Sequence, residues 1–194
     1  AGGIQAAQAV TGTGTVRLQA GGGNITQTGA GTVTAANLGA RATGNVDLNT
    51  LTNQVTGNFA ATSSGTGFIE FLDAGGFTVG SVAAGVFFGA ITGVTTNDGL
   101  IDLNTSGSMT VTDPITAGGT GRNVTLTTTA GGNVALAGLV TAVDDVVTIN
   151  SAGNITDSPA NTVNNITAIQ VTLNAVTGIG ATGLNGAIET SANL

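Results

Sequence analysis

Apolar residues recur along the chain in short triplets, in which two apolar residues flank one residue of another kind. Successive triplets begin 30, 23, 32, 23, 23 and 24 residues apart, so four of the six intervals agree within one residue. Alternation with a period of two is typical of a β-strand with one buried face. The triplets are Val16-Arg17-Leu18, Val46-Asp47-Leu48, Ile69-Glu70-Phe71, Ile101-Asp102-Leu103, Val124-Thr125-Leu126, Val147-Thr148-Ile149 and Val171-Thr172-Leu173.

Two further apolar positions follow each triplet, separated by Gly, Asn and Thr. Three short strands in about 23 residues describe one coil of a three-sided β-solenoid. We therefore expect an all-β chain, a right-handed parallel β-helix of about eight coils, because parallel crossovers are right-handed. Gly-Asn pairs at 44–45, 132–133 and 153–154 are expected to supply positive-φ corners. A β-sandwich is the alternative, but it has no reason to keep this repeat.

The repeat fills the chain, so we expect a single solenoid domain over residues 1–194. Residues 1–14 contain few apolar positions and are expected to form a partial first coil. The two longer intervals predict insertions near residues 30–45 and 80–97.

The position after each triplet is rich in asparagine. It reads Gln19, Asn49, Leu72, Asn104, Thr127, Asn150 and Asn174. Stacked amide side chains hydrogen-bond from rung to rung, so this column predicts a ladder of Asn49, Asn104, Asn150 and Asn174. The alternative is that asparagine is common here and favours turns.

The middle position of each triplet should face solvent, and three of these positions are acidic. Asp47, Glu70 and Asp102 would then be close enough to raise one another's pKa or to share a hard cation such as Ca²⁺. The alternative, which we favour, is a solvated acidic face with Arg17 offsetting Asp47 and no bound metal.

Composition excludes much chemistry. The chain has no Cys, His, Lys, Trp or Tyr, and its three arginines oppose ten acids for a formal charge of −7. Soft-ligand metal sites and His-, Cys- or Lys-based catalysis are therefore ruled out, and we expect neither a cofactor nor enzyme activity. The weak positive charge argues against nucleic-acid partners. No apolar run approaches the ~20 residues that span a bilayer, so we expect no membrane insertion.

Two enzyme or ligand alternatives have some support in the residues. Asp144-Asp145, or Glu70 with Asp73, would be the carboxylate pair of a carbohydrate-active solenoid. Neighbours on a strand point to opposite sides, however, which argues against the first pair. Repeated threonine doublets resemble those of ice-binding solenoids, but they shift position within the repeat.

The longest interval carries an apolar group, Val86, Phe87, Phe88 and Ile91. If this segment leaves the solenoid as a loop, these residues form an exposed patch that would mark an assembly contact. Otherwise they build an extra partial coil or plug the core.

The repeats resemble those of filamentous-haemagglutinin-like exoproteins, which are very large secreted bacterial adhesins. The matching segments include Gly132-Asn-Val-Ala-Leu-Ala-Gly-Leu-Val-Thr and Val147-Thr-Ile-Asn-Ser-Ala-Gly-Asn-Ile-Thr, and the pattern covers roughly 15–194. The resemblance implies a right-handed parallel β-helix and a secreted or cell-surface location. It also implies a structural rod in an extracellular filament, adhesin or matrix. The expected partners are further copies of the chain in a head-to-tail fibre, a continuation of a longer chain, or a surface glycan or receptor.

Overall fold

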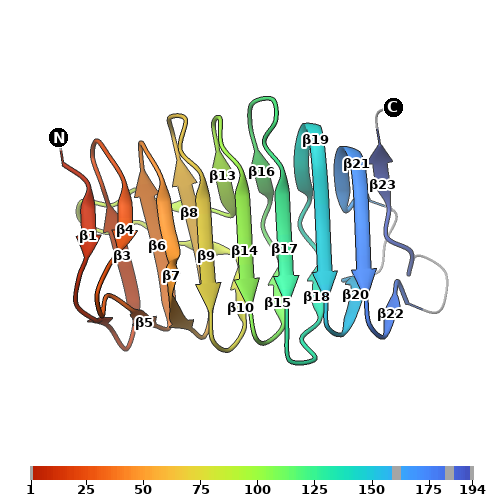
Figure 1. Cartoon of the computed structure of the whole chain (residues 1–194), viewed down its shortest axis with the longest axis horizontal. Helices are drawn as coiled ribbons and strands as arrows, with labels where there is room; N and C mark the ends of the chain where they lie inside the picture. Colours follow the sequence, from red (N-terminus) through yellow and green to blue (C-terminus); the bar gives the residue numbers. More distant parts are fainter. Residues whose placement is uncertain (1, 159–162, 182–185, 193–194) are drawn as a thin grey trace.

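The computed structural model of the chain describes residues 2–158, 163–181 and 186–192. Within these residues the regular structure is entirely β-strand, and no helix occurs. The strands wind into successive coils, and all of them except one antiparallel hairpin pair in parallel with strands of the neighbouring coils (Figure 1). The predicted parallel β-solenoid of about eight coils is therefore confirmed.

Each coil begins with a strand of the first stack, whose register fixes the coil length. The first residues of these strands form one column at positions 4, 25, 46, 69, 101, 124, 147 and 171. The stack comprises β1 (Ile4–Ala6), β4 (Ile25–Gln27), β7 (Val46–Val55), β9 (Ile69–Asp73), β14 (Ile101–Thr105), β17 (Val124–Thr128), and the later parts of β19 (Val140–Ser151) and β21 (Ile166–Ala175).

Two further stacks complete the coils. The second contains β2 (Val10–Thr11), β5 (Val33–Ala35), the end of β7, β10 (Phe77–Val79), β15 (Met109–Val111), β18 (Val134–Leu136), β20 (Asn154–Asp157) and β22 (Gly178–Ile179). The third contains β3 (Thr15–Gln19), β6 (Asn37–Ala42), β8 (Asn58–Ser63), β13 (Val94–Thr96), β16 (Ile115–Ala117), the starts of β19 and β21, and β23 (Thr190–Ala192). Because β10 pairs with the start of β8, the second and third stacks meet there.

The first triplet, Val16-Arg17-Leu18, lies in the third stack and not in the first. It pairs with residues 38–40 of β6, whereas Ile4–Ala6 occupies the first stack. The 30-residue interval therefore compared strands of different stacks, and the insertion expected near residues 30–45 is absent. Residues 4–24 instead form a coil as long as the next one, which corrects the partial coil expected at 1–14. The error arose because every stack uses the same apolar alternation.

The 32-residue coil contains an antiparallel hairpin, β11 (Ser81–Val82) and β12 (Ile91–Thr92), between β10 and β13. Its Val82, Phe88 and Ile91 form a small apolar cluster with Ala60 of β8, separate from the main core. The hairpin thus packs on the outside of the third stack.

The main core runs along the inside of the coils. Inward positions of the middle coils are fully buried, and their aliphatic side chains stack in columns. Phe59 and Phe71 stack face to face at 4.0 Å between ring centroids, and Phe77 meets both rings edge-on. These contacts place the largest side chains in the third and fourth coils, next to the hairpin.

Candidate functional site

The acidic column forms as expected on the outside of the first stack. Asp47 is paired in register with Glu70, and Glu70 with Asp102, on three successive coils. Arg17 does not offset Asp47, because Arg17 belongs to the third stack and its Nε donates to the carbonyl of Ala83 at 2.9 Å.

The stacking perturbs two of these carboxyl groups. Partial burial raises the pKa of Glu70, the charges of Asp47 and Asp102 raise it further, and a hydrogen bond from Asn49 opposes the rise. Burial also raises the pKa of Asp102, against a hydrogen bond from Asn104. Across the described part of the chain, no group of three or more acidic side chains is arranged to hold a metal ion.

The asparagine ladder predicted after the triplets forms at one step only. Asn174 Nδ2 donates to Asn150 Oδ1 at 2.8 Å. Asn49 Nδ2 instead donates to Glu70 Oε2 at 2.5 Å, and Asn104 Nδ2 to Asp102 Oδ1 at 2.9 Å. In this column Leu72 separates Asn49 from Asn104, and Thr127 separates Asn104 from Asn150. These two amides therefore bond to carboxylates of the acidic column.

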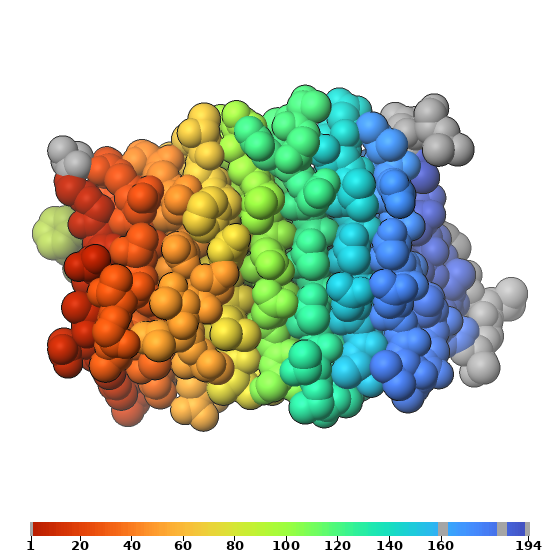
Figure 2. Space-filling model, viewed as in Figure 1, coloured from red at the N-terminus to blue at the C-terminus, as the bar shows by residue number. Residues whose placement is uncertain are grey.

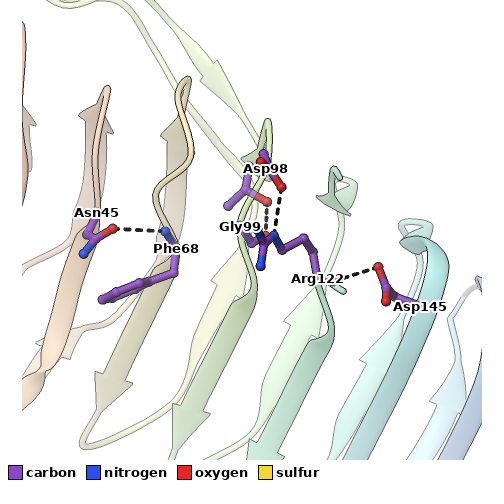
Figure 3. Close-up of polar contacts among 7 residues, drawn as sticks. Asn45, Phe68, Asp98, Gly99, Arg122 and Asp145 are labelled. Carbon is purple, nitrogen blue, oxygen red and sulfur yellow. Dashed lines mark hydrogen bonds and ion pairs between the residues drawn. The ribbon is translucent and has the colours of Figure 1, made fainter. Parts of the chain in front are cut away.

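A second asparagine ladder lies at the corners and was missed from the sequence. Here the asparagine stands at the corner where a strand starts, and its Oδ1 accepts the backbone N–H of the equivalent residue one coil later. One run leads from Asn24 to Asn45 and on to Phe68, with donor–acceptor distances of 2.9 and 3.3 Å. Figure 3 shows the second of these bonds, from the backbone N–H of Phe68 to Asn45. The same bond joins Asn37 to Asn58, Asn123 to Val146, Asn133 to Asn154 and Asn165 to Glu189.

This ladder explains the Gly-Asn pairs differently from the sequence prediction. Gly44, Gly132 and Gly153 do not have positive φ. A Cβ on Gly44 would instead collide with Oδ1 of Asn24, and one on Gly153 with Oδ1 of Asn133. Glycine is required there because the amide of the neighbouring coil occupies the space of a side chain.

A column of polar side chains is buried inside the corner that follows the first stack. Asp73 is 1% exposed, and its carboxylate accepts the backbone N–H groups of Val55, Gly75 and Gly76 at 2.7–3.1 Å. Asn53 and Gln27 bond to each other at 2.6 Å in the coils before it. The column is Gln27, Asn53, Asp73, Thr105, Thr128 and Ser151. Since these groups satisfy backbone at a turn, their role is structural.

The carboxylate pairs considered for glycoside chemistry do not converge. Asp73 is buried in that corner while Glu70 faces outward on the same strand. Asp145 accepts the backbone N–H of Arg122 at 2.7 Å, and the Arg122 side chain pairs with Asp98 at 2.8 Å (Figure 3). Asp144 has a positive φ of 62° at a corner. Through Arg122, Asp98 and Asp145 therefore link corners of adjacent coils.

Threonines share columns more regularly than the sequence suggested. The outward position of the third stack reads Thr62, Thr95, Thr116, Thr141, Thr167 and Ser191 in register. On the first stack the doublet Thr125-x-Thr127 is followed by Thr148-x-Asn150 and Thr172-x-Asn174. The columns are therefore single, and the doublet is not repeated from coil to coil.

The apolar group of the hairpin is divided between surface and interior. Val86 and Phe87 are 91% and 89% exposed, whereas Phe88 and Ile91 are 6% and 5% exposed. The segment therefore leaves the coil as a loop, as one alternative expected, but half of its apolar residues return to the solenoid.

The seat of the hairpin is built from small residues and two arginines. A Cβ on Gly39 would lie 2.8 Å from Cζ of Phe88, so only glycine admits the ring at this distance. Arg17 Nε donates to the Ala83 carbonyl, and Arg41 Nη2 donates to the Ala90 carbonyl at 3.0 Å. Arg41 also lies over the Phe88 ring, 5.8 Å from its centroid.

The two ends of the described rod differ from its middle. Seven core side chains of the first and last coils are only partly buried, whereas their equivalents in the middle coils are buried. A hollow of about 530 Å³ opens at the last coil between Leu173, Ala175 and Ile179. The partly buried core residues are Ile4, Val10, Val16, Val171, Leu173, Ala175 and Ile188.

Together these features define a parallel β-solenoid whose distinctive surfaces are an acidic column, a docked hairpin and end coils with partly buried core side chains. No family model matches the chain, and no curated protein or solved structure matches it either. Nothing among the described residues forms a helix that is long and apolar enough to cross a membrane.

Proposed function

We propose that the protein is a structural rod of an extracellular filament, surface adhesin or matrix, extended by stacking coils end to end. The observation that carries this proposal is the contrast between fully buried core columns in the middle coils and half-buried ones in the end coils. An added coil would bury the exposed apolar edges at about 25 cal/mol per Å² and pair free strand edges.

The surface supports a mechanical role. The stacked strands form continuous hydrogen-bonded ladders along the rod, and only 7% of residues are charged. Outward threonines and asparagines give a polar surface with little long-range charge. The resemblance to secreted exoproteins supports an extracellular location, with a surface glycan or receptor as a further partner.

Electron cryo-microscopy of the purified chain tests the end-to-end contact. We expect filaments with an uninterrupted coil repeat, in which each copy adds about eight rungs of 4.8 Å. Single rods of one copy's length at every concentration would contradict self-stacking.

A carbohydrate-active solenoid is the second candidate, and one observation favours it. The raised pKa of Glu70, between Asp47 and Asp102, is a property of catalytic acids. A hollow of about 470 Å³ lies beside this column, between Asn49, Leu72 and Asn104. Binding or cleavage of acidic and neutral polysaccharides that is lost in Glu70→Gln would support this candidate, and equal binding by both proteins would count against it.

A further inference from the structure

We propose that the hairpin tip, Val86 and Phe87, docks a second copy of this chain onto the first coil, by packing against β23 of that copy. This inference rests on the proposed function, because it assigns the contact that aligns and holds successive rods.

The tip is apolar and exposed, although the rest of the hairpin is docked. Val86 and Phe87 are the two most exposed large apolar residues among those described, yet Phe88 beside them is buried. Figure 2 shows the yellow-green atoms of the hairpin segment projecting past the red coil at the N-terminal end. An apolar tip held rigidly in water is expected to have a partner surface.

The hairpin runs along the rod and contacts one coil after another. Its base packs on Ala60 of β8, and Phe88 lies over Gly39 of β6. The next contact is made by Arg17 of β3, which binds the Ala83 carbonyl. Continued by one coil, the same path places the tip over a strand stacked on the far side of β3.

A hollow separates the tip from the first coil. It measures about 450 Å³. Ile4 of the first coil is only partly buried beside it, so a strand stacked on this end would cover both surfaces together. The lining residues are Ile4, Arg17, Gln19, Gly85, Val86, Phe87 and Phe88.

The last coil of another copy offers the required strand. Where the hairpin packs on the third stack, the outward residue is small, as Gly39 and Ala60 show. Ser191 of β23 belongs to the neighbouring outward column, which runs from Gln19 through Arg41 and Thr62 to Thr167, and Ser191 is small and exposed. When two copies stack end to end, β23 of one lies beside β3 of the other. Ser191 then lies next to Gln19, which lines the same hollow as Phe87, so Phe87 packs against Ser191.

Introduced cysteines test this contact directly, because the chain contains none of its own. Phe87→Cys and Ser191→Cys variants are purified separately, mixed and oxidised, and disulfide-linked dimers are counted on non-reducing gels. We expect Phe87→Cys to cross-link with Ser191→Cys at least about tenfold faster than with Thr172→Cys. Thr172 is a matched control because it faces outward in the last coil but on the first stack.

A second measurement separates the tip from stacking in general. Sedimentation velocity should show that the double variant Val86→Ser/Phe87→Ser weakens association at least about tenfold, since two large apolar contacts are lost. Val143→Ser removes a half-exposed apolar side chain away from the tip and should leave association unchanged.

The outcomes distinguish this inference from the proposed function. If filaments form but the tip variant assembles normally, or both cysteine pairs cross-link equally, the docking role is wrong while the filament stands. If the unmodified chain stays monomeric and no pair cross-links, docking by a second copy and self-stacking are both wrong.

Discussion

The third stack has two halves that differ in one feature, namely what covers them. In the first three coils its outward residues are Arg17, Gly39 and Ala60, and the hairpin packs on them. Two positions further along the strands, a second outward column reads Gln19, Arg41 and Thr62 in these coils and continues as Thr116, Thr141, Thr167 and Ser191 in the last four, where no hairpin covers it. The inward column between them is apolar from Leu18 through Ala40, Ala61, Val94, Ile115 and Val140 to Ile166, whether or not the hairpin covers the coil. The inner pattern therefore specifies the coil, and the outer residues differ between covered and uncovered coils.

Each choice is favourable only in its own setting. Threonine is β-branched, favours strands, and exposes a hydroxyl to water. Glycine within a strand costs about 0.5–1 kcal/mol, and at Gly39 the packed Phe88 ring offsets that cost. The glycine at position 39 is therefore explained by the docked hairpin.

The largest expected effect is the loss of stability when a core side chain is removed, compared between coils with and without the hairpin. Phe71→Ala should lower the free energy of unfolding by about 3–5 kcal/mol, because it empties a large buried volume and removes two ring contacts. Leu126 is equally buried, in a coil that the hairpin does not cover. Leu126→Ala should lower the free energy of unfolding by less than Phe71→Ala does, within the usual range of about 2–5 kcal/mol. Urea unfolding of both variants measures the difference, and a larger loss for Leu126→Ala would contradict it.

Removing the buried carboxylate at a corner should have the next largest effect. Asp73→Ala leaves three backbone N–H groups without their acceptor and should cost about 2–4 kcal/mol. Asp102→Ala removes the same group from the outer face one coil later and should change stability by less than about 0.5 kcal/mol. If thermal unfolding shows similar losses of stability for the two variants, the buried corner carboxylate contributes no more than the one on the outer face.

A substitution under the hairpin tests directly whether Gly39 is needed for the hairpin to pack on the third stack. Gly39→Val places a branched side chain where Phe88 lies and should release the hairpin. Amide hydrogen exchange over residues 81–92 should then accelerate at least about tenfold, while the core columns stay protected. Thr141→Val makes a similar strand surface in the uncovered half and should leave exchange unchanged. Unchanged exchange in Gly39→Val would contradict the packing described.

The smallest expected effect concerns the acidic column. Because the folded state raises the pKa of Glu70, it binds a proton more readily than the unfolded chain does. Stability should therefore rise as the pH falls through the raised pKa towards the ordinary value of 4.5. Glu70 is largely solvated, so the screened effect is about 0.3–0.5 kcal/mol. Glu70→Gln should show this gain at neutral pH and lose that pH dependence, which urea midpoints across this range would measure.

The sequence was sufficient for the fold because its information is repeated. Alternation within each strand and the 23-residue spacing predicted the stacks from Val46 onward, and Asp47, Glu70 and Asp102 do lie in one column. Assignment of Val16 failed because strands of different stacks share one pattern, and only the pairing partner separates them.

The contacts between side chains were harder to predict. Asparagine is frequent after the triplets, but whether two such amides bond to each other depends on how far apart they lie and how they are oriented. The corner asparagines, such as Asn24 and Asn133, have their Oδ1 directed at the next coil's N–H. Their position before an apolar strand was a readable signal. The seat at Gly39 depends on a hairpin more than 40 residues later, which no local pattern reveals.

The corner asparagine ladder has a consequence for how the chain acquires its structure. Each of its bonds joins residues 21–24 positions apart, a separation that most of the parallel strand pairs share. A nascent coil therefore closes only a short loop of chain, and it finds its template in the coil just completed. The coils can therefore form one after another from either end, because each coil needs only its neighbour. Because each step is local, a chain that emerges gradually from a ribosome or a pore can fold as it emerges.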